Sequence, residues 1–155
     1  MDVQTASTET VPAEEEIRSW IAATVTGRAT QEQVEVSVRL VDGDEMAKLN
    51  ETYRGKTGTT NVLSFPASLP GEPGIPLLGD IVICAPVVRA EAVAQGKSPN
   101  AHWAHMTIHG TLHLMGYDHT NEEEAGIMEA LETAILSELN YSCPYGAQLS
   151  PEHLQ

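Results

Sequence analysis

The segment from His109 to His119 most constrains what this chain can fold into. Its three histidines stand at positions i, i+4 and i+10, with Gly116 at i+7. Side chains four residues apart lie on one face of a helix about 6 Å apart, so the imidazoles of His109 and His113 can converge on one ion. Gly116 accepts the left-handed conformation that often ends a helix, and the turn after it can bring His119 to the same point. The spacing therefore predicts a helix that carries a metal site at its end.

The donor set predicts which kind of metal site this is. Three neutral imidazoles with an open fourth position are typical of a catalytic zinc site, and the open position would hold a water whose pKa the metal lowers to ~7. The spacing is that of the metzincin zinc proteases, except that Gly110 stands where those enzymes keep a glutamate. The missing glutamate argues against ordinary peptide hydrolysis. Nickel, cobalt and copper also bind three imidazoles, so the pattern leaves the metal open.

Two further histidines, His102 and His105, precede the motif. His105 is also four residues from His109, but it lies eight residues from His113, which is ~12 Å of helix rise. His105 and His113 therefore cannot bind one ion, and we choose the set next to the Gly116 turn. We expect His102 and His105 to be polar or cleft-lining residues, and a supporting role behind the ligands stays open.

Length and composition predict a soluble, cytoplasmic, single-domain protein. The chain has 155 residues, enough for one real core, and no stretch approaches the ~18 apolar residues of a membrane span. Residues 1–16 lack the basic and apolar regions of a secretory signal. The two cysteines form no disulfide framework, and Cys84 is expected to be a small buried apolar group.

The net charge of −14 argues against a general nucleic-acid coat protein, which would carry a broad basic surface. A local basic cleft remains compatible with this charge, because a bound divalent metal is itself a large local positive charge. The position of the eight lysines and arginines therefore matters more than their number.

Apolar periodicity predicts alternating helices and strands on one small mixed sheet, an α+β fold. Clustered prolines and glycines over 66–76 predict a surface loop. We expect a flexible N-terminus over 1–12, a folded domain over 13–142 and an irregular tail over 143–155. The expected helices cover 12–27, 42–55, 86–96, 98–115 and 120–140, with a Thr120–Glu123 capping box on the last, and the expected strands cover 34–40, 62–65 and 78–84.

Three sequence blocks carry a resemblance to a known family. The segment H-G-x-L-H-L-x-G-Y-D-H at 109–119 resembles the signature of the YbeY family, metal-dependent endoribonucleases of rRNA maturation. L-N-x-x-Y-R-G-K at 49–56, running into T-N-V-L-S-F-P at 60–66, and L-G-D-I-V-I at 78–83 match it in order and spacing. The resemblance covers about residues 33–141, nearly the whole predicted domain.

The resemblance implies a small mixed four-stranded sheet packed with about five helices. It implies one zinc ion held by His109, His113 and His119, and cleavage of single-stranded RNA in 16S rRNA 3′-end maturation and ribosome quality control. The family's cleft arginine matches Arg54, and an acidic cleft position matches Asp80. Both are therefore candidate catalytic residues in a protein that would act on the small ribosomal subunit.

The residue types agree with that reading and leave some roles open. The planar fork of Arg54 could hold a phosphate, but a cation after a helix end also favours the helix dipole. Asp80 could orient a ligand or water, or could be a simple turn residue. Asp118 is similarly ambiguous. The general base is undetermined, because either an activated water or an RNA 2′-hydroxyl could attack.

Two other functions remain open on the sequence. One is a metal-dependent peptide or amide hydrolase, which the histidine spacing allows. The other is a ribosome assembly factor with a mainly structural metal. The acidic surface suits docking on ribosomal proteins better than holding bare RNA, so we expect a protein partner on the small subunit and a monomeric chain.

Overall fold

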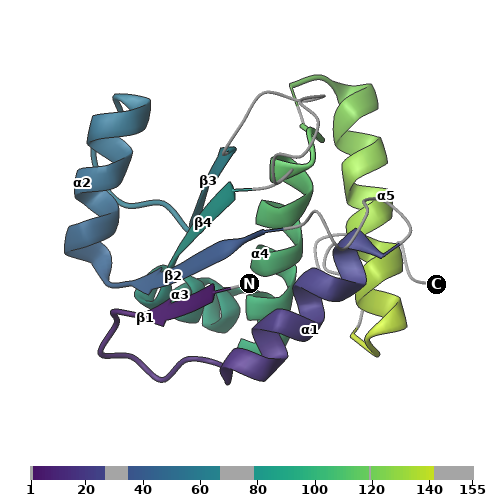
Figure 1. Ribbon diagram of the computed structural model, residues 1–155, viewed down its shortest axis with the longest axis horizontal. Helices are drawn as coiled ribbons and strands as arrows, with labels where there is room; N and C mark the ends of the chain where they lie inside the picture. The colour runs from purple at the N-terminus through teal and green to yellow at the C-terminus, as the bar shows by residue number, and fades with distance from the viewer. Residues whose placement is uncertain (1, 27–34, 67–78, 119, 142–155) are drawn as a thin grey trace.

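The computed structural model describes residues 2–26, 35–66, 79–118 and 120–141. Within these ranges it has four strands and five helices (Figure 1). The strands are β1 (Asp2–Thr5), β2 (Ser37–Val41), β3 (Val62–Pro66) and β4 (Gly79–Cys84). The helices are α1 (Glu14–Val25), α2 (Gly43–Arg54), α3 (Ala85–Gln95), α4 (Pro99–Leu114) and α5 (Glu122–Glu138).

The strands form one mixed sheet in the order β1-β2-β4-β3. β1, β2 and β4 run parallel, and β3 lies antiparallel at the edge beside β4, where Phe65 pairs with Asp80. The prediction of an α+β domain with a small mixed four-stranded sheet and about five helices is therefore confirmed. We find, among the described residues, no helix with the length and apolar character that a membrane span requires.

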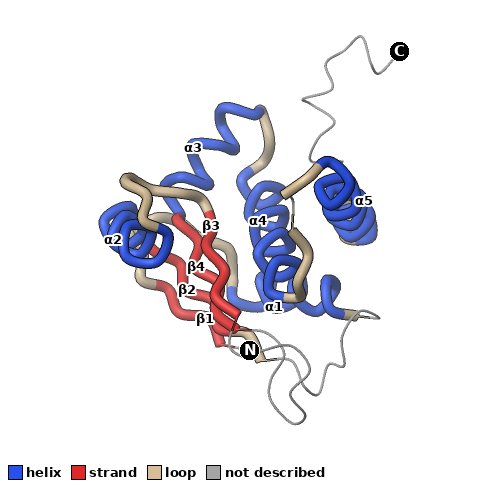
Figure 2. Tube along the Cα trace, turned by 90° about the horizontal axis from the view of Figure 1, so that it is seen from above, coloured by secondary structure: helices blue, strands red, loops and turns tan. Residues whose placement is uncertain are grey.

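Helices cover both faces of this sheet (Figure 2). α2 lies on one face, α4 and α1 lie on the other, and α5 packs on α4 from outside. Strand β4 contributes side chains to the cores on both faces of the sheet, because alternate side chains of a strand point to opposite faces. Ile81 and Ile83 join the larger core with α4, whereas Val82 and Cys84 join a smaller core with α2. This explains the nearly continuous apolar run of β4, and it confirms Cys84 as a buried group.

Helix α4 runs through the centre of the molecule. It begins as expected, with Pro99 at its first position and the Ser98 hydroxyl accepting a hydrogen bond from the Ala101 amide. The sheet, α1, α3 and α5 all pack against it, so its polar residues are buried together with its apolar ones. The side chains of a helix surrounded in this way can reach a ligand only where one side of the helix is open to solvent.

Gly110 allows α4 to approach the sheet closely. A Cβ atom built on Gly110 would lie 3.0 Å from a methyl of Ile81, 3.2 Å from a methyl of Val62 and 3.3 Å from the Ser64 hydroxyl. The Ser64 hydroxyl also donates a hydrogen bond to the Gly110 carbonyl, at 2.9 Å. The position where metzincins keep a glutamate therefore faces strands β3 and β4 and has no room for a side chain.

The predicted flexible N-terminus is wrong for residues 2–5, which form β1 and pair with β2. Ser7 and Thr8, which follow β1, are also attached to the domain, because the carboxylate of Asp42 accepts hydrogen bonds from both. β1 has one partly buried apolar side chain, Val3, so its own sequence carries little strand signal. Strand β1 therefore forms through its pairing with β2, which lies more than 30 residues away in the chain.

The predicted capping box of the last helix is also wrong. The side chain of Asn121, not Thr120, accepts the capping hydrogen bond, from the Glu124 amide at 2.8 Å. Thr120 instead donates its hydroxyl to the Glu124 carboxylate. Of the expected loop over 66–76, Pro66 is the last residue of β3 and the rest lies outside the described residues. The expected tail over 143–155 and the start of the expected strand at Val34 also lie outside them.

Two glycine-to-alanine substitutions should have opposite effects on stability. Gly110→Ala gains helix propensity but overpacks three contacts, so we expect the free energy of unfolding to fall by about 1 kcal/mol. Gly126→Ala, in the exposed middle of α5 with nothing near the new Cβ, should raise it by about 0.5–1 kcal/mol. Urea unfolding measures both, and a stabilised Gly110→Ala variant would show that α4 does not need this close approach.

Candidate metal centre

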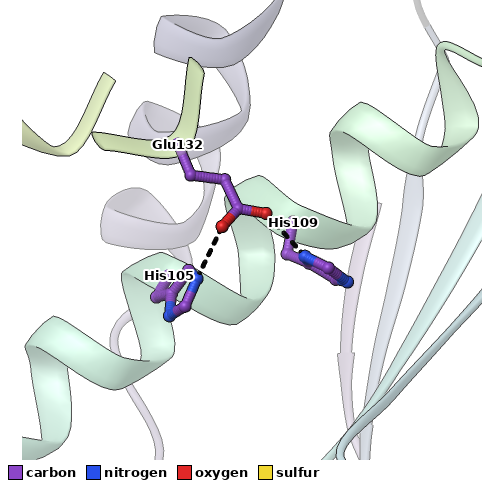
Figure 3. Close-up of side chains that lie close together, drawn as sticks. All are labelled: His105, His109 and Glu132. Carbon is purple, nitrogen blue, oxygen red and sulfur yellow. Dashed lines mark hydrogen bonds and ion pairs between the residues drawn. The ribbon is translucent and has the colours of Figure 1, made fainter. Parts of the chain in front are cut away.

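Two histidines of α4 share one buried carboxylate of α5. Glu132 reaches from α5 between His105 and His109, and its side chain is 0% exposed (Figure 3). One oxygen lies 2.8 Å from Nε2 of His105 and the other 2.6 Å from Nδ1 of His109. The helical spacing of four residues puts both rings on the side of α4 that faces α5.

The charge of Glu132 determines which nitrogens carry protons. Burial by itself raises the pKa of the Glu132 carboxyl, but the hydrogen bonds from His105 and His109 outweigh burial and lower that pKa to about 2. An ionised carboxylate can only accept, so Nδ1 of His109 must donate. In the neutral ring, Nε2 of His109 then carries the lone pair, and it points away from Glu132 (Figure 3).

That nitrogen faces the second histidine of the motif. Nε2 of His109 lies 3.1 Å from Nε2 of His113, with the ring centroids 4.6 Å apart. Two nitrogens bound to one tetrahedral zinc ion at its usual Zn–N distance are about 3.3 Å apart. The observed 3.1 Å is also a hydrogen-bond length, and it lies within a few tenths of an ångström of the spacing of two ligands on one ion.

His113 also has a carboxylate on its far side. Oδ1 of Asp118 lies 4.0 Å from Nδ1 of His113, and the Asp118 side chain is about half exposed. Each of the two rings thus directs Nε2 to the shared point and Nδ1 towards an acidic group. The 2.6 Å contact of Glu132 is a hydrogen bond of the kind that orients metal-binding histidines, whereas Asp118 at 4.0 Å lies beyond hydrogen-bond distance and only places a negative charge near the His113 ring.

The buried group itself could also hold a metal ion, because ligand atoms of His105, His109 and Glu132 all lie within 4.8 Å of one another. Its N···O separations of 2.6 and 2.8 Å are hydrogen-bond lengths and shorter than the ~3.3 Å spacing of two ligands on one zinc. His105 and Glu132 are also more enclosed than the His109–His113 pair. We interpret Glu132 as the residue that orients the His109 ring by a hydrogen bond, and His105 as the second hydrogen-bond partner of Glu132.

The His109–His113 pair opens into a cleft of about 600 Å³ between α4, the edge strand β3 and the end of α2. Eleven residues line this metal cleft: Tyr53, Arg54, Thr60, Asn61, Val62, Leu63, Ser64, Phe65, His109, His113 and Asp118. It therefore combines residues of two of the sequence blocks, which lie about 50 residues apart in the chain.

Arg54 brings positive charge to the metal cleft. It is the last residue of α2, which ends where Gly55 takes a left-handed conformation with φ of 66°. The other three described arginines each form an ion pair with a glutamate, whereas no ion pair among the described residues involves Arg54. Its guanidinium is exposed at the cleft and suited to an anion, which it can bind with two parallel hydrogen bonds.

Asp80 does not share the metal cleft. It lines a second cleft of about 430 Å³ on the α2 side of the sheet, with Arg39 and Glu45. Its neighbours Ile81 and Ile83 point to α4, so alternation turns Asp80 to the opposite face. Tyr53 and Phe65 line both clefts. The predicted catalytic role of Asp80 stays a prediction that this placement does not favour.

His102 belongs to a separate polar cluster. Its Nε2 lies 2.8 Å from Glu91, which also accepts hydrogen bonds from the Asn61 side chain at 3.2 and 3.3 Å. Burial lowers the pKa of His102. His102 does not line the metal cleft. It is connected to that cleft through Glu91 and Asn61 on one side and through the rings of His105 and His109 on the other.

The sequence reasoning missed Glu132. A signal was present, because Glu132 lies four residues after Met128 and three before Ile135, on the buried stripe of α5. A charged residue in such a stripe needs a partner, and here the partners are histidines. His119, the third predicted ligand, lies outside the described residues.

Comparisons with known proteins agree on one family. The family model described as Endoribonuclease YbeY matches residues 2–140. An Endoribonuclease YbeY of Cellvibrio japonicus is 52% identical over 152 residues, which cover 98% of this chain and 85% of that protein. One from Pseudomonas savastanoi is 51% identical over 154 residues, covering 99% and 92%. The solution structure of a Thermotoga maritima protein has the same fold, with a TM-score of 0.56, 23% identity, and coverage of 96% of this chain and 97% of that one.

Glu132→Gln should weaken metal binding without unfolding the chain. The amide keeps the size of the side chain, but it carries no charge and has one acceptor oxygen in place of two, so it cannot accept a hydrogen bond from both His105 and His109 through separate oxygens. Outer carboxylates of this kind affect metal affinity about 10–100-fold, and we expect a loss in that range. Competition with a chromogenic chelator measures it, with Glu129→Gln on the exposed side of α5 as the matched control.

The same titration distinguishes the two metal sets. If His113→Ala kept zinc affinity while Glu132→Gln abolished binding, the ion would belong to the buried His105–His109–Glu132 group instead.

Proposed function

Because this chain belongs to the YbeY family, we propose that it is a zinc-dependent endoribonuclease that cleaves single-stranded RNA. One observation carries the proposal: the Nε2 atoms of His109 and His113 lie 3.1 Å apart in the cleft that also contains Arg54. Phosphodiester hydrolysis needs neutralisation of the charge on the phosphate and a means of positioning it. A metal ion bound by the two histidines, together with Arg54, which forms no ion pair among the described residues, would supply both the neutralising charge and the positioning.

We propose His109, His113 and His119 as the ligands of one zinc ion. The fit of the two Nε2 atoms to a tetrahedral site, and the acidic groups behind both rings, support the first two. His119 is proposed from the motif and the family resemblance. Zinc bound there would supply Lewis-acid chemistry, which activates water and offsets the charge on a phosphate.

Arg54 would bind the non-bridging oxygens of the phosphate at the cleaved bond. Its planar guanidinium donates two parallel hydrogen bonds, which fixes the orientation of the phosphate as well as its position. Lys56, two residues further along the chain, is also exposed and would add charge to the RNA path. Asn61, His109 and His113 line the same cleft, so they would lie near a phosphate bound by Arg54.

The packing of Gly110 disfavours a peptide hydrolase. A metzincin needs a glutamate at this position as its general base, and here a Cβ atom would lie closer to Ile81, Val62 and Ser64 than ordinary van der Waals contact allows. The RNA reaction need not use a base at this position, because the proton of an attacking water or 2′-hydroxyl could pass to another group. Attack by water and attack by the 2′-hydroxyl are both compatible with the cleft.

We extend the proposal to 16S rRNA 3′-end maturation and ribosome quality control in the cytoplasm. The net charge of −14 supports a role on the small ribosomal subunit, where ribosomal proteins would attract the acidic surface and the cleft would receive the RNA end. We propose that the chain acts there as a monomer.

His113→Ala should abolish RNA cleavage while the chain stays folded. The substrate is an end-labelled RNA with a duplex stem and a single-stranded tail, given to wild type and variant purified in parallel. We expect the wild type to cut only in the tail, a chelator to stop the reaction and zinc to restore it. Equal cutting by both proteins would identify a contaminant, and an unfolded variant by circular dichroism would indicate a structural metal.

Arg54→Ala should lower kcat/KM by about 10²–10³, the usual effect of removing one donor that stabilises transition-state charge. Arg54→Lys should recover only part of this, because an ammonium group lacks the planar fork. Arg18→Ala is the matched control, since Arg18 pairs with Glu14 on the exposed side of α1. Cleavage rates of Arg54→Ala equal to those of Arg18→Ala would remove Arg54 from the mechanism.

A further inference from the structure

Tyr53 is an exposed aromatic residue beside the metal cleft. Its side chain is 64% exposed, and it is the one aromatic among the exposed large apolar residues of the described chain. The other two, Val93 and Ile127, are aliphatic and lie on α3 and α5. Single exposed apolar residues are common, so exposure alone decides nothing. The surroundings of Tyr53 are what set it apart.

Tyr53 stands where the two clefts meet. It lines the metal cleft together with Arg54, and it lines the second cleft together with Asp80. Its ring contacts the ring of Phe65 on edge strand β3 in a T-shaped arrangement, with centroids 5.2 Å apart and an interplanar angle of 67°. A ring held in this way keeps a defined orientation, and its large exposure leaves much of the surface open to a ligand.

We propose that Tyr53 stacks on a nucleobase of the RNA substrate, next to the phosphate that Arg54 binds. This inference rests on the proposed endoribonuclease function. Aromatic side chains bind single-stranded RNA by stacking on bases, whatever the base, because every base has a flat face. The adjacent positions of Arg54 and Tyr53 in the last turn of α2 supply one contact for the backbone and one for the base.

This stacking accounts for single-strand selectivity. In a duplex every base is paired and stacked on its neighbours, so its face is not available to a protein ring. A single strand can turn one base out onto Tyr53 while its phosphate enters the metal cleft. The strand would then pass over the edge of β3, between the two clefts that share Tyr53 and Phe65.

Kinetics with RNA lacking one base test the inference. The full-length zinc-loaded protein receives a short single-stranded RNA, intact or with one abasic nucleotide placed in turn at each position around the cleaved bond. For wild type, we expect one position at which base removal raises KM about tenfold and changes kcat less than about twofold. Tyr53→Leu, which keeps an apolar cover over Phe65, should raise KM for intact RNA about tenfold.

The combination of variant and substrate separates stacking from packing. Tyr53→Leu should show no further penalty at the critical abasic position, and Tyr53→Phe, which keeps the ring, should behave as wild type. An equal abasic penalty in wild type and Tyr53→Leu overturns the stacking role, as does an unchanged KM in Tyr53→Leu. Failure of the wild type to cut any RNA would instead overturn the proposed function, and this inference with it.

Discussion

The hydrogen bonding of the buried Glu132 carboxylate with His105 and His109 is the interaction on which the candidate metal centre depends. A fully buried charge is costly unless it is hydrogen-bonded, and here two histidines of α4 meet that need. The same contacts attach α5 to α4 and hold Nδ1 of His109 as a donor. Because a neutral imidazole has one donor and one acceptor nitrogen, this directs the lone pair of His109 towards His113. One interaction therefore contributes both to the packing of α5 on α4 and to the orientation of the His109 ring.

A second constraint is the close contact of α4 with the sheet at Gly110. Without a side chain there, the helix settles against Ile81 and Val62, and the Ser64 hydroxyl bonds to the Gly110 carbonyl. This brings the histidines over the edge strand β3 and next to the end of α2. The same glycine removes the base that a metzincin would use. One packing requirement thus both positions His109 and His113 and excludes a glutamate at position 110.

The elements that the sequence predicted well are those with strong local signals. Gly55 and Gly96 end α2 and α3 in left-handed conformations, and Ser98 with Pro99 begins α4. The misses have weak local signals. β1 carries one partly buried apolar residue and forms through pairing with β2. At the start of α5, adjacent Thr120 and Asn121 can both cap a helix, and only the path of the incoming chain selects between them.

The sequence by itself determined the family, the α+β class and the spacing that puts His109 and His113 on one face of a helix. Helical periodicity is local, so these follow from residues a few positions apart. Tertiary structure alone decided that Glu132 supports His109 and that Asp80 lies on the other face of the sheet, and it placed Arg54, until then a cleft residue by resemblance only, in one cleft with His109 and His113. These relations join residues 23 to about 60 positions apart. They depend on which face each strand presents and how closely each helix packs, and no local pattern encodes either.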